Sequence, residues 1–338
     1  MDRSLPVDRE TGWKILAGFA VAGIVLYVVA SQFGLDEVVD TLAGADLRWL
    51  AVGCLSTTVC LVLWGKAWHV VLRVAGIDVP FRKLVGTYFA ATFANYVTPL
   101  GQAGGEPFIA YVLSRDTEAS YEESLASVVT ADLLNLLPFF SFSAIGLSVL
   151  LAQSSLPGAA QSLAWGLLAM AVGVPVLVGL AWRYRERVRG GVLRLVRPVT
   201  RITSRLSVDG VARRIDELYE SFGRIAQDRR ALVVAVVFAY AGWVFFALPL
   251  YFAGKTLAVP GIDPLLVLFV VPASTLAGLT PSPGGTGGVE LALVALLVAL
   301  TPVSNAVALS IALVYRVMSY WFALVVGGVA AVAVVARS

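Results

Sequence analysis

The chain has 338 residues, of which 59% are hydrophobic and only 14% are charged, and its mean hydropathy is +0.84. These values are typical of an integral membrane protein and leave no polar stretch long enough to fold as a soluble catalytic domain. The formal net charge is only +3, and no basic motif interleaved with aromatic residues occurs, so we expect no nucleic-acid partner.

The residues that could hold a metal are poorly spaced for it. Cys54 and Cys60 lie six residues apart in an apolar segment, and His69 is the only histidine. The sequence contains neither an HExxH nor a CxxC motif. We therefore expect buried free thiols, no metal centre and no cofactor.

Apolar runs of spanning length occur at 13–30, 49–72, 124–151, 159–181, 231–254 and 305–335. A helix needs about 20 mainly apolar residues to cross the hydrocarbon core of a bilayer. We expect the first run to be a retained helix rather than a cleaved signal peptide, because it is long and its flank is acidic. The last run is long enough for one tilted helix or two short ones. Together the runs predict an all-α polytopic membrane protein with about six full spanning helices, in a single transmembrane domain over residues 1–338.

Two further apolar regions are interrupted by helix-breaking residues beside a carboxylate. The first motif reads TPLGQAGGE from Thr98 to Glu106, and the second reads TPSPGGTGGVE from Thr280 to Glu290. A helical arm of twelve residues rises only ~18 Å, well short of a hydrocarbon core of ~30 Å. We therefore predict two re-entrant hairpins, over 81–115 and 264–300.

The placement of Lys and Arg predicts the orientation of the chain in the membrane. Cytoplasmic loops carry an excess of these residues. The loop over 183–230 holds thirteen arginines against six acidic residues, so we place it in the cytoplasm with both termini. On this map the two hairpins enter from opposite faces of the membrane, as an inverted repeat requires.

Two polar segments show the periodicity of amphipathic helices. In 207–227, within the cytoplasmic basic loop, apolar residues recur at intervals of three and four. We expect this helix to lie on the membrane or beneath the helix bundle; a regulatory or dimer contact is the alternative. Residues 36–43 form a shorter candidate of the same kind on the outer surface.

Each motif ends in one carboxylate, Glu106 or Glu290, at the start of the returning arm. An acidic residue there is also explained by ordinary capping of a helix start. However, a hairpin tip lies near the middle of the membrane, where a carboxylate is costly. We expect these side chains to pair with a cation, to accept a coupling proton or to shape a substrate cavity.

The motif glycines allow backbone conformations that other residues avoid, and they leave N–H groups free at the start of a half-helix. Such N–H groups form an anion site suited to phosphate. The alternative is a tight turn that lets helices pack closely, and both can hold together. The glycines assigned to this candidate site are Gly104, Gly105, Gly284, Gly285, Gly287 and Gly288.

Arg316 lies near the middle of the last apolar run, where an arginine costs ~2.5–3.5 kcal/mol on translocon scales. It must therefore face a partner or water. A structural salt bridge to Glu290 or Glu106 is one reading, and binding of a lipid phosphate by the guanidinium fork is the other. Asp132 and Asn135 share one face of 124–151 and could supply a further partner.

The chain resembles the lysylphosphatidylglycerol synthase transmembrane-region family of flippase-like integral membrane proteins. The likeness rests on the stretches Pro99–Glu106 with Leu113–Arg115, Pro281–Glu290, and Tyr315–Arg316 with Tyr320–Trp321. The resemblance implies a role in moving lipids between leaflets. In the fused synthases this region precedes a soluble aminoacyl-transferase domain. We expect a stand-alone member that performs no aminoacyl transfer.

The function expected from these observations is a lipid flippase or transporter in the cell membrane rather than an enzyme. Its substrate would be an anionic lipid or a lipid-linked, polyprenyl-phosphate type molecule. No GxxxxGK[ST] nucleotide motif occurs, so we expect the drive to be an ion gradient or the gradient of the substrate itself. The pair of titratable residues, Glu106 and Glu290, makes protons the simplest choice of ion. The alternative is an intramembrane enzyme or an accessory subunit that acts on lipid-linked cell-envelope precursors. Membrane lipids are the expected partners, and the sequence leaves homo-oligomerisation open.

Overall fold

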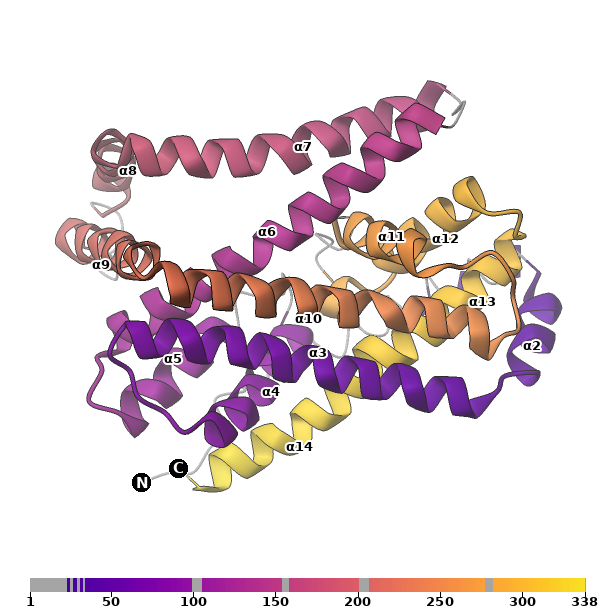
Figure 1. Cartoon of the computed structure of the whole chain (residues 1–338), viewed down its shortest axis with the longest axis horizontal. Coiled ribbons are helices and arrows are strands. Elements are labelled where there is room, and N and C mark those ends of the chain that lie inside the picture. Colours follow the sequence, from indigo (N-terminus) through magenta and orange to yellow (C-terminus); the bar gives the residue numbers. More distant parts are fainter. Residues whose placement is uncertain are drawn as a thin grey trace. The chain divides into compact units, whose positions relative to one another are not determined.

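The computed structural model describes residues 34–98, 105–153, 158–200, 207–276 and 282–337, with three short pieces between residues 23 and 32. Every regular element within these ranges is helical, which confirms the predicted all-α fold (Figure 1). The α-helices are α2 Leu35–Ala43, α3 Leu47–Val74, α4 Phe81–Val97, α5 Gly105–Asp116, α6 Tyr121–Gln153, α7 Gly158–Arg183, α8 Arg185–Thr200, α9 Val208–Gln227, α10 Arg229–Thr256, α11 Pro264–Leu276, α12 Gly288–Leu300, α13 Asn305–Arg316 and α14 Phe322–Arg337.

Five helical segments in the described part of the chain are long and apolar enough to cross a membrane. They are Leu47–Val74, Tyr121–Val149, Arg229–Thr256, Pro283–Leu300 and Asn305–Val334. A sixth candidate is the pair Leu168–Arg183 and Arg185–Pro198, which is bent by 96°. These segments confirm a polytopic membrane protein. Most of the predicted span 13–30 lies outside the described residues.

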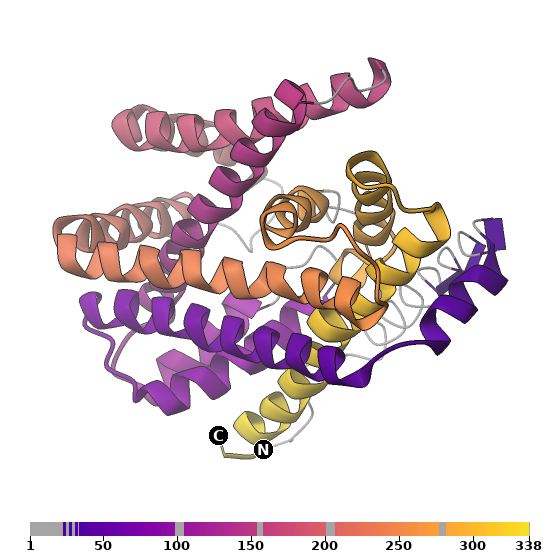
Figure 2. The same ribbon diagram turned by 45° about the vertical axis from the view of Figure 1, so that its right-hand side comes forward.

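The last apolar run is a single helical segment rather than two separate helices. Helices α13 and α14 are joined by a π-helical turn, η3 Val317–Trp321, and run end to end (Figure 2). The wider turn is recorded in the hydrogen bond from the Phe322 N–H to the Val317 carbonyl. In addition, Thr57 of α3 donates its hydroxyl to the Met318 carbonyl at 2.9 Å.

Each of the two interrupted regions contains two short helices, and that these form re-entrant hairpins stays a prediction. Helices α4 and α5 have 17 and 12 residues, and α11 and α12 have 13 each. Helix α11 starts where Asp263 accepts hydrogen bonds from the N–H groups of Leu265 and Leu266. Helices α11 and α12 pack against each other. The segment Pro283–Leu300 reaches spanning length only with its turn residues, so insertion of the two pairs from opposite faces stays a prediction.

The described residues form two compact units. Those of 1–62, 85–108 and 242–338 make the first unit, and those of 63–84 and 109–241 make the second. In the first unit α12 packs against both α11 and α13. In the second unit α6 packs against α7 and α9, and α8 packs against α9.

Candidate functional site: a buried ion pair at a glycine-rich turn

Glu290 lies in the first turn of α12 and is almost fully buried, with 1% of its surface exposed. Its carboxylate turns back toward the helix start, where Oε2 accepts a hydrogen bond from the Gly287 N–H at 2.7 Å. This is the capping geometry that the sequence allowed for. The same carboxylate keeps Oε1 available for a second partner.

Arg316 is the last residue of α13, and its guanidinium is the second partner of Glu290. Arg316 Nε donates to Glu290 Oε1 at 2.8 Å, and Nη2 donates to the Gly284 carbonyl at 2.9 Å and to Thr286 Oγ1 at 3.3 Å. Only 7% of the Arg316 surface is exposed. Of the two readings open for Arg316, the structure therefore contains the salt bridge to Glu290.

The π-helical turn after Arg316 places an aromatic ring over the guanidinium. The Tyr320 ring centroid lies 4.1 Å from the Arg316 Cζ atom. Tyr320 also donates its hydroxyl to the Tyr96 carbonyl at 3.1 Å, and the two tyrosine rings are 4.9 Å apart. π-helical turns are rare and often occur at functional sites, so this turn makes the ion pair the candidate site.

The glycines of the second motif are needed for the turn that faces Arg316. Gly284, Gly285 and Gly287 have φ angles of 58°, 65° and 93°, in the region that residues with a side chain rarely adopt. At Gly284 a Cβ atom would overlap the Tyr320 ring. Gly288 begins α12. The turn therefore brings a backbone carbonyl, a hydroxyl and a carboxylate around one guanidinium.

The pair is electrically neutral and its members are already satisfied by protein groups. Burying two charges is costly, and the cost is offset only when geometry is good and further hydrogen bonds are made. Here the carboxylate has the Gly287 N–H, and the guanidinium has the Gly284 carbonyl and Thr286 hydroxyl. An incoming phosphate would have to compete with Glu290 for Arg316.

The first motif is described only from Gly105 onward; Gly104 lies outside the described residues. The Gly105 N–H donates to Asn95 Oδ1 at 2.6 Å, so a side chain of α4 caps the start of α5. A Cβ on Gly105 would lie 2.7 Å from the Ala91 carbonyl, which leaves no room for a side chain. Glu106 is half-buried in the first turn of α5.

Asp132 and Asn135 lie on α6 in the second compact unit, and both are half-buried. Asp132 Oδ1 accepts a hydrogen bond from the Trp68 indole N–H of α3 at 2.9 Å. The charge of Asp132 therefore has a structural partner within its own unit. That Asp132 and Asn135 contribute to a substrate site stays a prediction.

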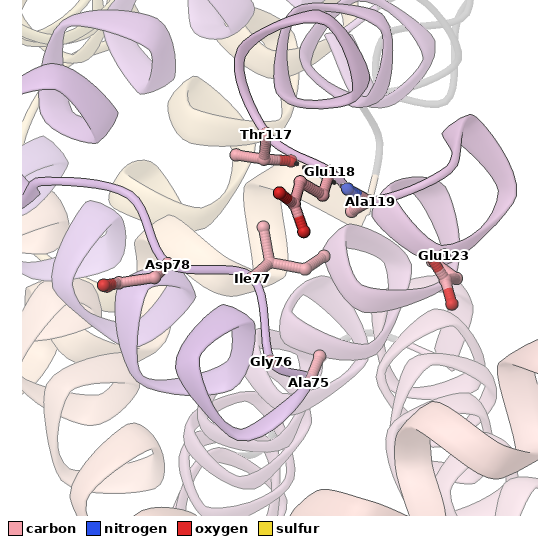
Figure 3. Close-up of a pocket in the computed structure, with 8 residues that line it drawn as sticks. All are labelled: Ala75, Gly76, Ile77, Asp78, Thr117, Glu118, Ala119 and Glu123. Atoms are coloured by element: carbon pink, nitrogen blue, oxygen red, sulfur yellow. Dashed lines mark hydrogen bonds between the residues drawn. The ribbon is translucent and has the colours of Figure 1, made fainter.

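A separate cavity of about 450 Å³ lies in the second unit (Figure 3). It is lined by the loop residues Ala75, Gly76, Ile77, Asp78, Thr117, Glu118 and Ala119 and by Glu123 of α6. Glu123 accepts hydrogen bonds from the Ser120 N–H and hydroxyl, so it caps the start of α6. The lining carries three carboxylates, which makes this cavity unsuited to an anion. No motif in the sequence predicts this cavity.

Sequence reasoning did not assign two residues of the ion-pair site, Thr286 and Tyr320, or the residue that caps the start of α5, Asn95. Thr286 lies inside the second motif, where its hydroxyl was not distinguished from its glycine neighbours. Tyr320 follows Arg316 by four residues, a spacing that places the two on one helix face. Asn95 precedes the first motif, and a polar amide in an apolar helix was the available signal.

The helical fold and its apolar segments define a multi-pass membrane protein. Residues 15–327 match the family described as the lysylphosphatidylglycerol synthase TM region. Since the match covers most of the chain, the protein belongs to this family.

Relatives of the chain include small membrane proteins of archaea. A UPF0104 membrane protein of Pyrococcus horikoshii is 24% identical over 320 residues, which cover 91% of this chain and 94% of that protein. A UPF0104 membrane protein of Methanothermobacter thermautotrophicus is 24% identical over 334 residues, with coverages of 96% and 94%. These relatives match the chain over almost their whole length.

A third relative has a name that states an activity. Glycosyltransferase AglD of Haloferax volcanii is 26% identical over 321 residues, which cover 88% of this chain but only 51% of that protein. The names of the relatives thus leave open whether members of this group are enzymes.

Proposed function

We propose that the protein is a lipid translocator of the cell membrane, which moves an anionic lipid or a polyprenyl-phosphate type lipid between leaflets. The observation that supports this most is the buried pair of Arg316 and Glu290 on a glycine-rich turn. A guanidinium can bind a phosphate through two parallel N–H donors. A titratable carboxylate that holds the guanidinium can free it for this contact by taking up a proton.

The proposed exchange starts from the closed pair. A proton taken up by the Glu290 carboxylate removes the negative charge that holds Arg316 Nε. The guanidinium then keeps its positive charge and can turn Nε and Nη2 toward a lipid phosphate, while the acyl or prenyl chains stay in the bilayer. Loss of the proton restores the ion pair and displaces the phosphate. Transport and proton movement would be coupled by this competition.

In the described geometry the ion pair is formed, which is the arrangement from which the proposed exchange starts. Both members of the pair are buried, and the guanidinium is held by Gly284 and Thr286 as well as by Glu290. A headgroup can reach Arg316 only if the glycine-rich turn or the Tyr320 ring moves. Positive-φ glycines are well suited to such a change because they restrict the backbone least.

The test is leaflet exchange of fluorescent phospholipid and of a polyprenyl phosphate by the pure full-length protein in liposomes. Arg316→Lys keeps the charge but loses the planar fork, and Glu290→Gln loses the titratable group. We expect both variants to exchange lipid much more slowly than the wild type. Arg189→Ala is the matched control, since it breaks an exposed arginine–carboxylate pair with Asp216.

Removing one member of a buried pair can also unfold a protein, at a cost of about 3–5 kcal/mol. A double variant, Glu290→Leu with Arg316→Met, replaces the pair by apolar side chains of similar size, which is often close to neutral for stability. We expect this variant to fold and to exchange no lipid. Full exchange by the folded double variant would refute the proposed role of the pair.

The second candidate function is an intramembrane enzyme or an accessory subunit that acts on lipid-linked cell-envelope precursors. The name of the Haloferax volcanii relative favours it. Glu290, Glu106 and Asp132 would then be the candidate general acids and bases. Chemical change of a lipid-linked sugar by the pure protein, without exchange between leaflets, would support this function over translocation.

A further inference from the structure

Helix α8 makes a sharp corner with the apolar helix before it. The segments Leu168–Arg183 and Arg185–Pro198 meet at 96°, with Tyr184 at the corner. Figure 1 shows α8 almost end-on at the end of α7. If α7 crosses the membrane, a helix at a right angle to it lies along the membrane surface.

One face of α8 combines arginines with exposed apolar side chains. Arg187 and Arg194 are seven residues apart, and so are Val188 and Leu195, so each pair is stacked two turns apart on the same side. Arg187 and Arg194 are exposed, Val188 is 37% exposed and Leu195 is 75% exposed. An exposed leucine beside arginines is the pattern of a helix that lies at a lipid interface.

The rotation of α8 is fixed by a two-point contact with α9. Arg189 Nε and Nη2 donate to the two carboxylate oxygens of Asp216 at 2.6 and 2.8 Å. With 100° per residue, Arg187 and Arg194 lie about 160° and 140° around the helix from Arg189. Their face therefore points away from α9.

Aromatic residues at the corner have the composition of a membrane–water boundary. Trp182 lies at the end of α7, and the exposed Tyr184 follows it. The Tyr184 ring centroid is 5.4 Å from Arg187 Cζ and 5.9 Å from Arg183 Cζ. Tryptophan and tyrosine are enriched at the level of the lipid headgroups.

We propose that this face of α8 is a binding surface for the anionic headgroups of the adjacent leaflet. Arg187 and Arg194 bind lipid phosphates, and Val188 and Leu195 enter the boundary between headgroups and acyl chains. The partner is an anionic phospholipid, because the face carries two arginines and no carboxylate. The surface is distinct from the Glu290–Arg316 site, and its role does not depend on lipid translocation.

The experiment places a spin label at Leu195 in the full-length protein, with Cys54 and Cys60 replaced by alanine. The accessibility of the spin label to oxygen and to a polar nickel reagent is measured in phosphatidylcholine nanodiscs that contain an increasing fraction of phosphatidylglycerol. We expect the Leu195 label to become shielded from the polar reagent as phosphatidylglycerol is added. A label at Glu186, about 180° around α8 from Leu195, is expected to stay water-exposed.

Charge-reversal variants distinguish lipid binding at this face of α8 from a general effect of net charge. In Arg187→Glu/Arg194→Glu, half-maximal shielding of the Leu195 label should require at least about fivefold more phosphatidylglycerol. Arg213→Glu/Arg214→Glu changes two exposed arginines of α9 by the same charge and should cause no shift. The proposal is wrong if the Leu195 label stays as exposed as the Glu186 label, or if both double variants shift equally. If shielding of the Leu195 label increases with protein concentration rather than with phosphatidylglycerol, the face contacts a second copy of the chain, and the proposal is also wrong.

Discussion

Gly284 and Tyr320 are in direct contact, with no space between the Gly284 backbone and the Tyr320 ring for even a methyl group. The contact joins the glycine-rich turn to the π-helical turn after Arg316. Because Gly284 also offers its carbonyl to Arg316, the position of the tyrosine ring and the binding of the guanidinium depend on the same residue.

Gly284→Ala should therefore destabilise the protein and loosen the ion pair. The substitution forces a side chain onto a backbone with a φ of 58° and pushes it into the Tyr320 ring. We expect a loss of about 2–4 kcal/mol in the free energy of unfolding, from backbone strain and overpacking together. Thermal unfolding followed by tryptophan fluorescence would measure it.

The matched control is Gly173→Ala in α7. A Cβ on Gly173 meets nothing within 4 Å, and the residue lies inside a helix. Alanine is there expected to be neutral or stabilising by up to about 1 kcal/mol. Equal effects of the two substitutions would contradict the role given to the Gly284–Tyr320 contact.

Thr57→Val tests whether the π-helical turn is supported from α3. The Thr57 hydroxyl is the donor to the Met318 carbonyl, and valine has nearly the same shape without it. We expect a loss of about 1–3 kcal/mol, since the carbonyl would be left buried without this donor. Thr58→Val is the control, because the Thr58 hydroxyl bonds the Cys54 carbonyl within its own helix. The interpretation fails if the two variants unfold at the same temperature.

Asn95 is predicted to hold the start of α5 against α4. Asn95→Leu removes the acceptor of the Gly105 N–H and should cost about 1–2 kcal/mol, as loss of a helix cap does. Asn95→Asp keeps an acceptor oxygen and should retain more of the stability. Hydrogen exchange of the Gly105 amide, measured by mass spectrometry of the peptide that contains it, would report the change locally. Equal exchange in all three proteins would rule the capping role out.

The sequence predicted the helical elements well because their signal is local. The short helices of 13 residues on either side of the second motif follow from apolar runs bounded by proline and glycine. The candidate partner of Arg316 could also be narrowed to two carboxylates from the sequence, because a buried arginine needs a partner. The choice of Glu290 depends on how α12 packs against α13, which the sequence pattern does not contain.

The remaining features depend on contacts between segments that are distant in the sequence. The hydrogen bond from Trp68 to Asp132 joins residues 64 positions apart, and that from Tyr320 to Tyr96 joins residues 224 apart. Around the 96° corner at Tyr184, the sequence pattern indicates only an ordinary helix end followed by a basic loop. Neither periodicity nor composition determines such pairings or corners.

The last prediction concerns pH and the contact between α9 and α6. Glu217 of α9 has a buried Oε2 atom with no hydrogen-bond partner among the described residues. Burial, and then repulsion from Glu122, raises the pKa of the Glu217 carboxyl above its usual value, although Arg213 and Arg214 oppose the rise. The acidic residues that contribute are those at the start of α6, Glu122 and Glu123.

A raised pKa in the folded state means that the folded protein binds this proton more tightly than the unfolded chain does. The contribution of Glu217 to stability should therefore fall as the pH rises from about 4.5, its ordinary value, through the higher pKa of the folded state. Glu217→Gln removes this penalty, so the variant should be more stable than the wild type at pH 7, by about 0.5 kcal/mol.

Melting temperatures of both proteins between pH 5 and pH 7 would measure the difference, which should shrink on acidification. Asp209→Asn, an exposed acid of the same helix, is the control for a general loss of negative charge. If Glu217→Gln lowers the melting temperature at pH 7, its carboxylate has a favourable partner there and the explanation by burial is wrong. If the gain is the same at both pH values, the effect comes from packing of the amide rather than from titration, because only a titrating group makes the difference depend on pH.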